Sequence, residues 1–275
     1  MKTLLIPPIP HLDLASDREF HLTLAHLYKH PQYSEFYLQE AQKGKYIILD
    51  NSAHEFQVGE SAENLLRLAL EVQASEIVLP DHLFDGFDTI VRTKSALEYI
   101  GTHPTDRTFQ YMIVPQGQSF EEYSWCLSAL VDVYFEAQVS YGEIFPHPPV
   151  LGVSKDYEMW EGGLLRILDE LVLPCSNTEM PVHMLGWGRK LWDLGVIAQK
   201  YSHLLRSVDS AKPIVYGLNN IRLYPGEYIP KYPTRSQSYF FDEISEEGLS
   251  AIQHNIEIFD ILVGSTSQND HDLSS

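Results

Sequence analysis

Six short apolar segments of this sequence end at, or carry, a residue that can take part in catalysis or binding. Three of these residues are aspartates, one is a glutamine and two are glycines: Asp50, Asp81, Asp209, Gln116, Gly152 and Gly186. In a parallel α/β barrel the C-terminal ends of all strands open onto one face, so residues far apart in sequence converge on one pocket. The repeated pattern therefore predicts a site assembled from several strand ends.

The first two aspartates could serve as acids, bases or hydrogen-bond acceptors. Asp50 opens a dense polar cluster, residues 50–55. A partly desolvated carboxylate at a strand end can have its pKa moved toward general acid or base work. Asp50 could equally cap the following loop. Asp81 follows Pro80, and this pair fits a turn as well as a binding site.

Gln116 and the glycines fit recognition of a flat ligand. The Gln116 amide offers both a donor and an acceptor, which reading the edge of a heterocycle requires, although Pro-Gln-Gly could simply turn the chain. Gly152 and Gly186 fit tight turns after strands, and they would also let a planar ligand approach backbone N–H groups.

Helical patterns separate the apolar segments. Ser61 can cap a helix whose apolar residues share one face, and residues 119–122 form a capping box before another amphipathic stretch. Strands that alternate with helices imply right-handed crossovers and a parallel sheet. With residues 2–6 as an opening strand we expect seven strands, and residues 131–135 could hold the eighth or finish the preceding helix. A closed barrel is favoured over an open sheet because candidate residues lie at nearly every strand end.

The predicted fold is a single α/β domain, a (β/α)8 TIM-like barrel over residues 1–263 without a zinc subdomain, and a disordered tail over residues 264–275. The length of 275 residues and the hydrophobic fraction of 44% fit one globular domain. No run approaches the roughly 18 apolar residues that span a bilayer. Prolines interrupt the N-terminal apolar run, so we expect a cytoplasmic protein with no membrane contact.

Several classes of site are excluded by motif. Cys126 and Cys175 have no CxxC partner, which excludes a disulfide framework and a thiolate zinc site. The sequence contains no HxH or HExxH pair and no GxxxxGK[ST] or GxGxxG loop. The net charge of −19, taken alone, argues against nucleic acid, because contacts of Lys and Arg with phosphate supply most non-specific affinity.

One segment departs from this acidic balance. Between Lys212 and Phe241 four basic residues and one acidic residue give a local net charge of +3, and five tyrosines lie among them. Positive charge mixed with aromatic faces suits single-stranded or flipped nucleotides, and a surface loop packed on the barrel would show the same composition. The candidate nucleic-acid contacts are Lys212, Arg222, Lys231 and Arg235.

In their order along the chain, the strand-end motifs resemble those of the tRNA-guanine transglycosylase family. They are more similar to those of its shortened bacteriophage relatives, which put 7-deazaguanine bases into DNA. The similarity runs from about Lys45 to Gly217. Six motifs carry it: Leu49–Ser52, Val78–Asp81, Val114–Gly117, Leu151–Ser154, Met184–Gly188 and Val208–Ala211.

The resemblance implies a pentosyltransferase that exchanges guanine in DNA for a 7-deazaguanine, such as preQ0 or a derivative, without breaking the sugar-phosphate backbone. Asp209 would attack C1′, expel guanine and hold a covalent glycosyl-enzyme intermediate. Asp50 would take the proton from N9 of the incoming base. The target base must be flipped out of the duplex to enter the pocket.

The resemblance also implies how the base is bound. Asp81 would accept hydrogen bonds from N1–H and the exocyclic amine, while Gln116 and the backbone near Gly152 would address the carbonyl side. The full set of implied base-binding residues is Ser52, Asp81, Gln116, Gly152, Val153 and Gly186.

Two departures from the family narrow these expectations. The tRNA enzymes carry a zinc site of three cysteines and one histidine after the nucleophile, whereas this chain has no cysteine beyond Cys175, so neither zinc nor another cofactor is expected. The chain also lacks room for the extra RNA-binding domains of the archaeal enzymes.

Expected partners are DNA, the free 7-deazaguanine base and a helper protein, unless a concentrated basic surface replaces the helper. The alternatives are exchange into tRNA, a hydrolase whose intermediate is captured by water, and a non-catalytic barrel that binds a nucleobase or nucleic acid.

Overall fold

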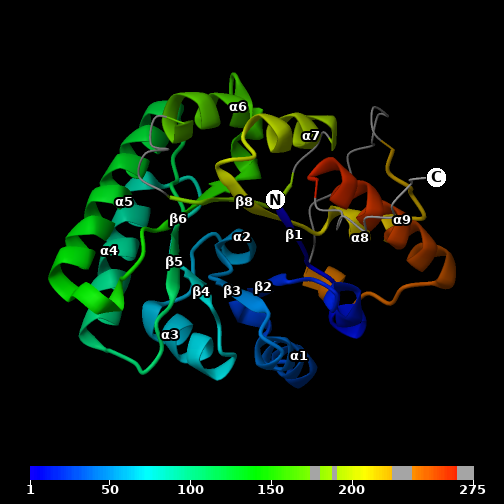
Figure 1. Cartoon of the computed structure of the whole chain (residues 1–275), viewed down its shortest axis with the longest axis horizontal. Coiled ribbons are helices and arrows are strands. Elements are labelled where there is room, and N and C mark those ends of the chain that lie inside the picture. The colour runs from blue at the N-terminus through cyan, green and yellow to red at the C-terminus, as the bar shows by residue number, and fades with distance from the viewer. Residues whose placement is uncertain (174–179, 188–190, 225–236, 265–275) are drawn as a thin grey trace, which may run out of the picture.

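The computed structural model describes residues 1–173, 180–187, 191–224 and 237–264. Within these ranges eight parallel strands form a barrel that helices surround (Figure 1). The strands pair in the order β1-β8-β7-β6-β5-β4-β3-β2, and β1 and β2 lie beside each other where the ring closes. The predicted (β/α)8 barrel is confirmed. The strands are β1 (Lys2–Leu5), β2 (Phe20–Leu24), β3 (Tyr46–Asp50), β4 (Glu76–Val78), β5 (Gln110–Ile113), β6 (Val150–Ser154), β7 (Val182–Leu185) and β8 (Leu205–Ser210).

Four of the longer helices, α3, α4, α5 and α9, begin at a side-chain cap. The Ser61 hydroxyl accepts the N–H of Asn64 at 3.3 Å, and the Ser119 hydroxyl accepts the N–H of Glu122 at 3.2 Å. These caps satisfy N–H groups that a helix leaves without an internal partner. The α-helices are α1 (Pro31–Gln42), α2 (Ala53–Phe56), α3 (Ala62–Glu71), α4 (Gly86–Thr102), α5 (Phe120–Tyr141), α6 (Gly163–Ile167), α7 (Leu191–Lys200), α8 (Lys212–Leu218) and α9 (Glu246–Leu262).

The eighth strand is β2, and residues 131–135 continue helix α5. Of the two interpretations of that stretch, the helical one is therefore right. Strand β2 alternates apolar residues with His21 and Thr23, and both of these polar side chains are buried. The His21 ring packs edge-on against Phe36 and Tyr37 of α1. Because His21 and Thr23 lie on the helix-facing side, β2 lacks the continuous apolar run that marks the other strands in the sequence. This strand is therefore not predicted from the sequence.

The N-terminal end of the barrel interior is filled by charged and aromatic side chains. Arg206 of β8 reaches across to Glu76 of β4, with the closest nitrogen and oxygen 2.6 Å apart. The Tyr46 hydroxyl donates to the same carboxylate at 2.7 Å, and Phe20 stacks on the Tyr46 ring. We call these four residues the interior plug.

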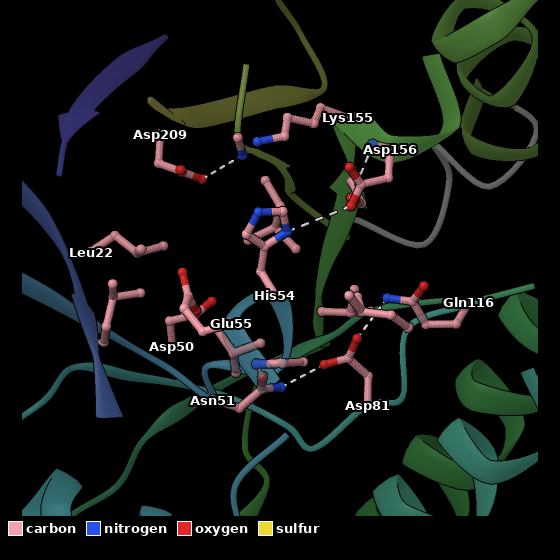
Figure 2. A pocket seen from close by; sticks show the side chains of 18 of the residues that line it. Leu22, Asp50, Asn51, His54, Glu55, Asp81, Gln116, Lys155, Asp156 and Asp209 are labelled. Carbon is pink, nitrogen blue, oxygen red and sulfur yellow. Dashed lines mark hydrogen bonds and ion pairs between the residues drawn. The ribbon is translucent and has the colours of Figure 1, made fainter. Parts of the chain in front are cut away.

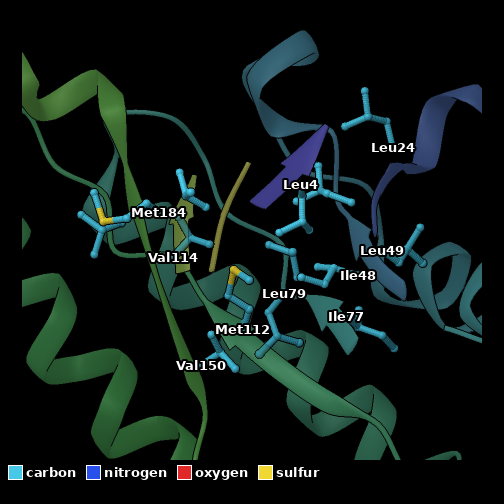
Figure 3. Packing of buried hydrophobic residues seen from close by; sticks show 14 of the residues in the cluster. Leu4, Leu24, Ile48, Leu49, Ile77, Leu79, Met112, Val114, Val150 and Met184 are labelled. Carbon is cyan, nitrogen blue, oxygen red and sulfur yellow. The ribbon is translucent and has the colours of Figure 1, made fainter. Parts of the chain in front are cut away.

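Apolar side chains from all eight strands, or from the residue just after a strand, pack in one cluster around the barrel, part of which Figure 3 shows. Alternate residues of a strand face the interior and the helices, as in other barrels of this kind. The labelled members are Leu4, Leu24, Ile48, Leu49, Ile77, Leu79, Met112, Val114, Val150 and Met184.

Strand β8 contains one extra residue. Val182 of β7 pairs with Leu205, but the next residue, His183, pairs with Ser207, so Arg206 forms a bulge. A bulge lets two adjacent residues depart from the strict alternation of a strand. Arg206 and Ser207 both make contacts inside the barrel, to Glu76 and His183 respectively.

Two sequence predictions concern parts of the chain that the structure does not cover. Of the predicted tail, residues 265–275 lie outside the described residues, as does Cys175. Along the described ranges, no helix has the length and apolar character needed to cross a membrane.

Candidate functional site

A pocket opens at the carboxyl ends of the strands, and the predicted residues Asp50, Asp81, Gln116, Gly186 and Asp209 all line it (Figure 2). The open space among its lining side chains, including the mouth, is about 580 Å³. Residues separated by up to 159 positions in sequence therefore share one cavity, as strand-end placement predicted.

Asp81 lies at the centre of a buried hydrogen-bond cluster. Its Oδ1 accepts from Asn51 Nδ2 at 2.7 Å, and its Oδ2 accepts from Gln116 Nε2 at 2.6 Å. Burial raises the pKa of Asp81 to about 6, although both hydrogen bonds act in the opposite direction. A carboxylate can accept about four hydrogen bonds, so acceptor capacity remains for a ligand.

The orientation of the Gln116 amide is fixed by its neighbours. Its Oε1 accepts from the Tyr157 hydroxyl and from the N–H of Phe84. With two donors on Oε1, the Nε2 group must face Asp81. The Tyr157 hydroxyl also accepts the N–H of Gly117 at 3.2 Å, so this tyrosine holds both the side chain and the following loop.

Asp209 is held at one oxygen by two groups, one from β7 and one from the residue that follows it. Its Oδ1 accepts the N–H of Gly186 at 2.8 Å and lies 3.1 Å from His183 Nε2. Gly186 has a φ of +65°, a backbone conformation that side-chain-bearing residues rarely adopt. A Cβ at this position would also lie 3.1 Å from the Lys155 ammonium, so Lys155 crosses directly over Gly186.

Asp50 is a carboxyl group in a setting that favours its neutral form. Burial raises its pKa well above the ordinary range, and the negative charges of Glu55, Asp209 and Asp81 act in the same direction. The N–H of Ser52 donates to Asp50 Oδ1 at 2.7 Å and opposes the shift. This environment suits a group that holds a proton and releases it to a substrate.

The mouth of the pocket carries charges of both signs. His54 Nδ1 lies 3.7 Å from Asp156 Oδ2, and the Ser154 hydroxyl donates to the same oxygen at 3.1 Å. Burial would raise the pKa of Asp156, but the His54 hydrogen bond, the charges of His54 and Lys155 and the Ser154 hydrogen bond lower it overall. Asp156 therefore stays ionised where Asp50 tends to stay neutral.

Three predicted base-binding residues do not line the pocket. Ser52 is buried behind it and contacts His26 Nδ1 at 2.9 Å. Val153 is buried at the β6 position next to Gly152 and so lies on the opposite side of the strand. Gly152 lies below the pocket floor, where an added Cβ would meet Leu185 at 2.8 Å and Val114 at 3.0 Å.

Two of the predicted nucleic-acid contacts, Lys212 and Arg222, lie outside the pocket lining. Lys212 is half-buried at the first position of α8, three residues after Asp209. Arg222 is exposed and donates to the Ser250 hydroxyl of α9 at 3.0 Å. Lys231 and Arg235 lie outside the described residues.

The structure also adds residues that sequence reasoning did not assign to the site. The added pocket and supporting residues are Asn51, Glu55, Tyr157, Lys155, Asp156 and His183. Asn51 and Glu55 belong to the polar cluster after β3, and Lys155 and Asp156 directly follow β6, so strand-end position could have indicated them. No sequence motif singles out His183 or indicates its contact with Asp209.

Fold and site together define a (β/α)8 barrel with an acidic pocket whose lining contains five carboxylates and one lysine. Among the described side chains, no group of three or more His, Cys, Asp or Glu is arranged to hold a metal ion. The carboxylates differ in their surroundings, which is the arrangement that separates acid, base and nucleophile roles.

Comparison with protein families and with curated proteins finds no match. A search of solved structures finds a weak similarity to a variant of the carboxyl transferase domain of pyruvate carboxylase from Rhizobium etli, determined with pyruvate. The two chains are 9% identical with a TM-score of 0.43, and the alignment covers 90% of this chain and 42% of the other. A similarity of this size says nothing about activity.

Proposed function

We propose that this protein is a base-exchange transglycosylase that replaces guanine in DNA with a 7-deazaguanine through a covalent intermediate on Asp209. The observation that carries the proposal is the convergence of Asp50, Asp81, Gln116 and Asp209 on one pocket. The order of the strand-end motifs along the sequence supports the same function.

In the first half of the reaction Asp209 is the nucleophile. Its carboxylate oxygen forms a bond to C1′ of the flipped nucleotide while the bond between C1′ and N9 breaks, and the electron pair of that bond leaves with guanine. The buried Asp50 carboxyl, with its raised pKa, gives its proton to the departing base. The sugar remains attached to Asp209, and both phosphodiester bonds stay intact.

In the second half the incoming base reverses these steps. Its N9–H gives a proton to the Asp50 carboxylate, and N9 attacks C1′ as the bond from C1′ to Asp209 breaks. Asp209 returns as a carboxylate and Asp50 as a carboxyl, so the enzyme is unchanged over the cycle. The N–H of Gly186 and the His183 ring stabilise the carboxylate that is released.

Asp81 and Gln116 recognise the base. Asp81 accepts from N1–H and from the exocyclic amine of a guanine-like face, and its raised pKa falls when these donors arrive. The Gln116 amide cannot rotate freely because Tyr157 and Phe84 hold its oxygen. A pre-oriented amide of this kind discriminates between bases better than one that must be ordered on binding.

The test is incorporation of isotope-labelled guanine and labelled preQ0 into DNA and into tRNA, measured side by side with the wild-type protein. We expect label in DNA, retained after denaturation. Asp209→Asn keeps an oxygen for the Gly186 N–H but removes the nucleophile, so exchange falls below detection while free-base binding persists. Asp106→Asn, at an exposed loop position, is the matched control and retains full activity.

Three outcomes would contradict parts of the proposal. Label in tRNA alone would favour the tRNA substrate, and label in neither polymer despite base binding would favour a non-catalytic barrel. Exchange by Asp209→Asn at the wild-type rate would remove Asp209 as nucleophile. A denaturation-stable adduct of protein and DNA, formed by the wild type alone, would support the covalent step directly.

A further inference from the structure

A chain of buried polar contacts leads from the interior plug to Asp209. Arg206 is paired with Glu76, and its Nε donates to the Ser207 hydroxyl at 3.1 Å. The Ser207 hydroxyl lies 2.7 Å from His183 Nδ1, and His183 Nε2 lies 3.1 Å from Asp209 Oδ1. The Ser207 and His183 side chains are fully buried.

The groups at the two ends of the chain set the direction of each hydrogen bond. Arg206 Nε can only donate, so the Ser207 oxygen accepts from it, and the Asp209 carboxylate, as the nucleophile, can only accept, so His183 Nε2 carries the proton that faces it. In a neutral ring Nδ1 is then unprotonated and accepts the Ser207 hydrogen. If the ring is doubly protonated, Nε2 also carries a proton. In both states His183 donates to Asp209.

We propose that His183 is a positioning residue for Asp209 and that Ser207, held by Arg206, supports the ring tautomer in which it acts. The inference rests on the proposed function, because it assigns His183 a part in presenting the nucleophile. Two donors on a single oxygen, His183 Nε2 and the Gly186 N–H, fix the plane in which the carboxylate meets C1′. An attacking group held in one orientation reacts faster than one that samples several.

The barrel offers a matched comparison for a buried histidine. His21 of β2 is 1% exposed and His183 is 0% exposed, so the two are equally inaccessible. His21 faces Phe36 and Tyr37 of α1 on the outer side of the sheet, away from the pocket. Substitutions of His21 therefore report the cost of losing a buried imidazole without any effect on Asp209.

The kinetic test compares side chains that keep or remove the Nε2 donor. In His183→Gln the amide nitrogen takes the place of Nε2, whereas in His183→Asn it takes the place of Nδ1 and in His183→Leu no donor remains. We expect kcat for base exchange to fall about 10- to 100-fold in the Asn and Leu variants, the effect of one hydrogen bond to a charged group. The KM for free base should change little, and the Gln variant should recover most of the rate.

A second measurement needs no substrate. Nitrogen NMR of protein labelled at histidine, with the His183 signals assigned by their loss in His183→Gln, shows which ring nitrogen is protonated. We expect the proton on Nε2 in the wild type and, in Ser207→Ala, a shifted Nδ1 signal, because that nitrogen has lost its hydrogen-bond donor. His21→Gln and His21→Leu should leave both kcat and the His183 signals unchanged.

The outcomes separate this inference from the proposed function. A wild-type protein that shows the Nε2 tautomer but exchanges no base would overturn the proposed function and leave the hydrogen-bond chain in place. A neutral ring protonated on Nδ1 would overturn the chain. If folded His183→Gln is as slow as His183→Leu while the wild type exchanges base, the donor has no role in positioning Asp209.

Discussion

The raised pKa of the buried Asp81 carboxyl makes the free energy of unfolding depend on pH. Its pKa is raised from 3.8 to about 6 in the folded protein, mainly by burial. In the window between these values the folded chain keeps a proton that the unfolded chain has released. The folded state therefore loses stability as pH rises through this window, and the loss is complete above the folded pKa.

The size of the effect follows from the shift. A difference of about 2 pH units, at about 1.4 kcal/mol for each unit, gives a loss of about 3 kcal/mol between pH 4 and pH 7. Residue 81 cannot titrate in Asp81→Asn, so the stability of this variant does not fall for this reason as pH rises. Its amide nitrogen would face Gln116 Nε2 or Asn51 Nδ2, and the resulting clash of donors adds a constant cost of about 1–3 kcal/mol at every pH.

The assay is urea-induced unfolding of the wild type and of Asp81→Asn from pH 4 to pH 7. The difference in unfolding free energy between them should change by about 3 kcal/mol, with the wild type losing its advantage as pH rises. Asp156→Asn is the contrasting control. Because the folded pKa of Asp156 is lowered, its contribution to stability grows as pH rises. A difference for Asp81 that is constant, or that grows with pH, would show that its two hydrogen bonds outweigh its burial.

Two further substitutions test the pocket. Asp50→Asn keeps an oxygen for the Ser52 N–H but cannot carry the proton, so we expect exchange to fall about 10²- to 10⁴-fold while the melting temperature at pH 7 rises. An unchanged labelling rate would remove Asp50 from the chemistry. Gly152→Ala places a methyl group 2.8 Å from Leu185 and 3.0 Å from Val114, and both of these side chains line the pocket. We expect a stability loss of about 1–3 kcal/mol from overpacking and a raised KM for free base at similar kcat, whereas an unaltered KM would show that the pocket floor is compliant.

Much of the site could be predicted because the barrel topology converts sequence order into position. Four site residues lie at the end of an apolar segment or directly after it: Asp50, Asp81, Gln116 and Asp209. Parallel strands bring all such ends to one face of the barrel. Choosing the residue within a motif was harder. Val153 lies on the side of β6 that faces away from the pocket. Gly152 and Ser154 share the other side, but Gly152 lies below the pocket floor, so only Ser154 of the three lines the pocket.

The supporting residues could not be predicted from apolar patterning. Ser207 and Arg206 are polar residues of a strand interior, and a bulge that breaks alternation leaves no mark in the sequence. Tyr157 lies 41 positions from Gln116 and reaches it only through the fold. The same limit applies to β2, where His21 and Thr23 are buried although their residue types suggest exposure.

The extra residue in β8 allows two tasks that a regular strand could not combine. In unbroken alternation adjacent residues face opposite sides, so a strand that sent Ser207 toward His183 would send Arg206 toward the helices. With the bulge, Arg206 of β8 fills the N-terminal end of the barrel interior, while Ser207 of the same strand contacts His183 below the pocket. The proposed ester on Asp209 would have the interior plug at the filled end of the barrel and the pocket mouth, where the incoming base would enter, at the other.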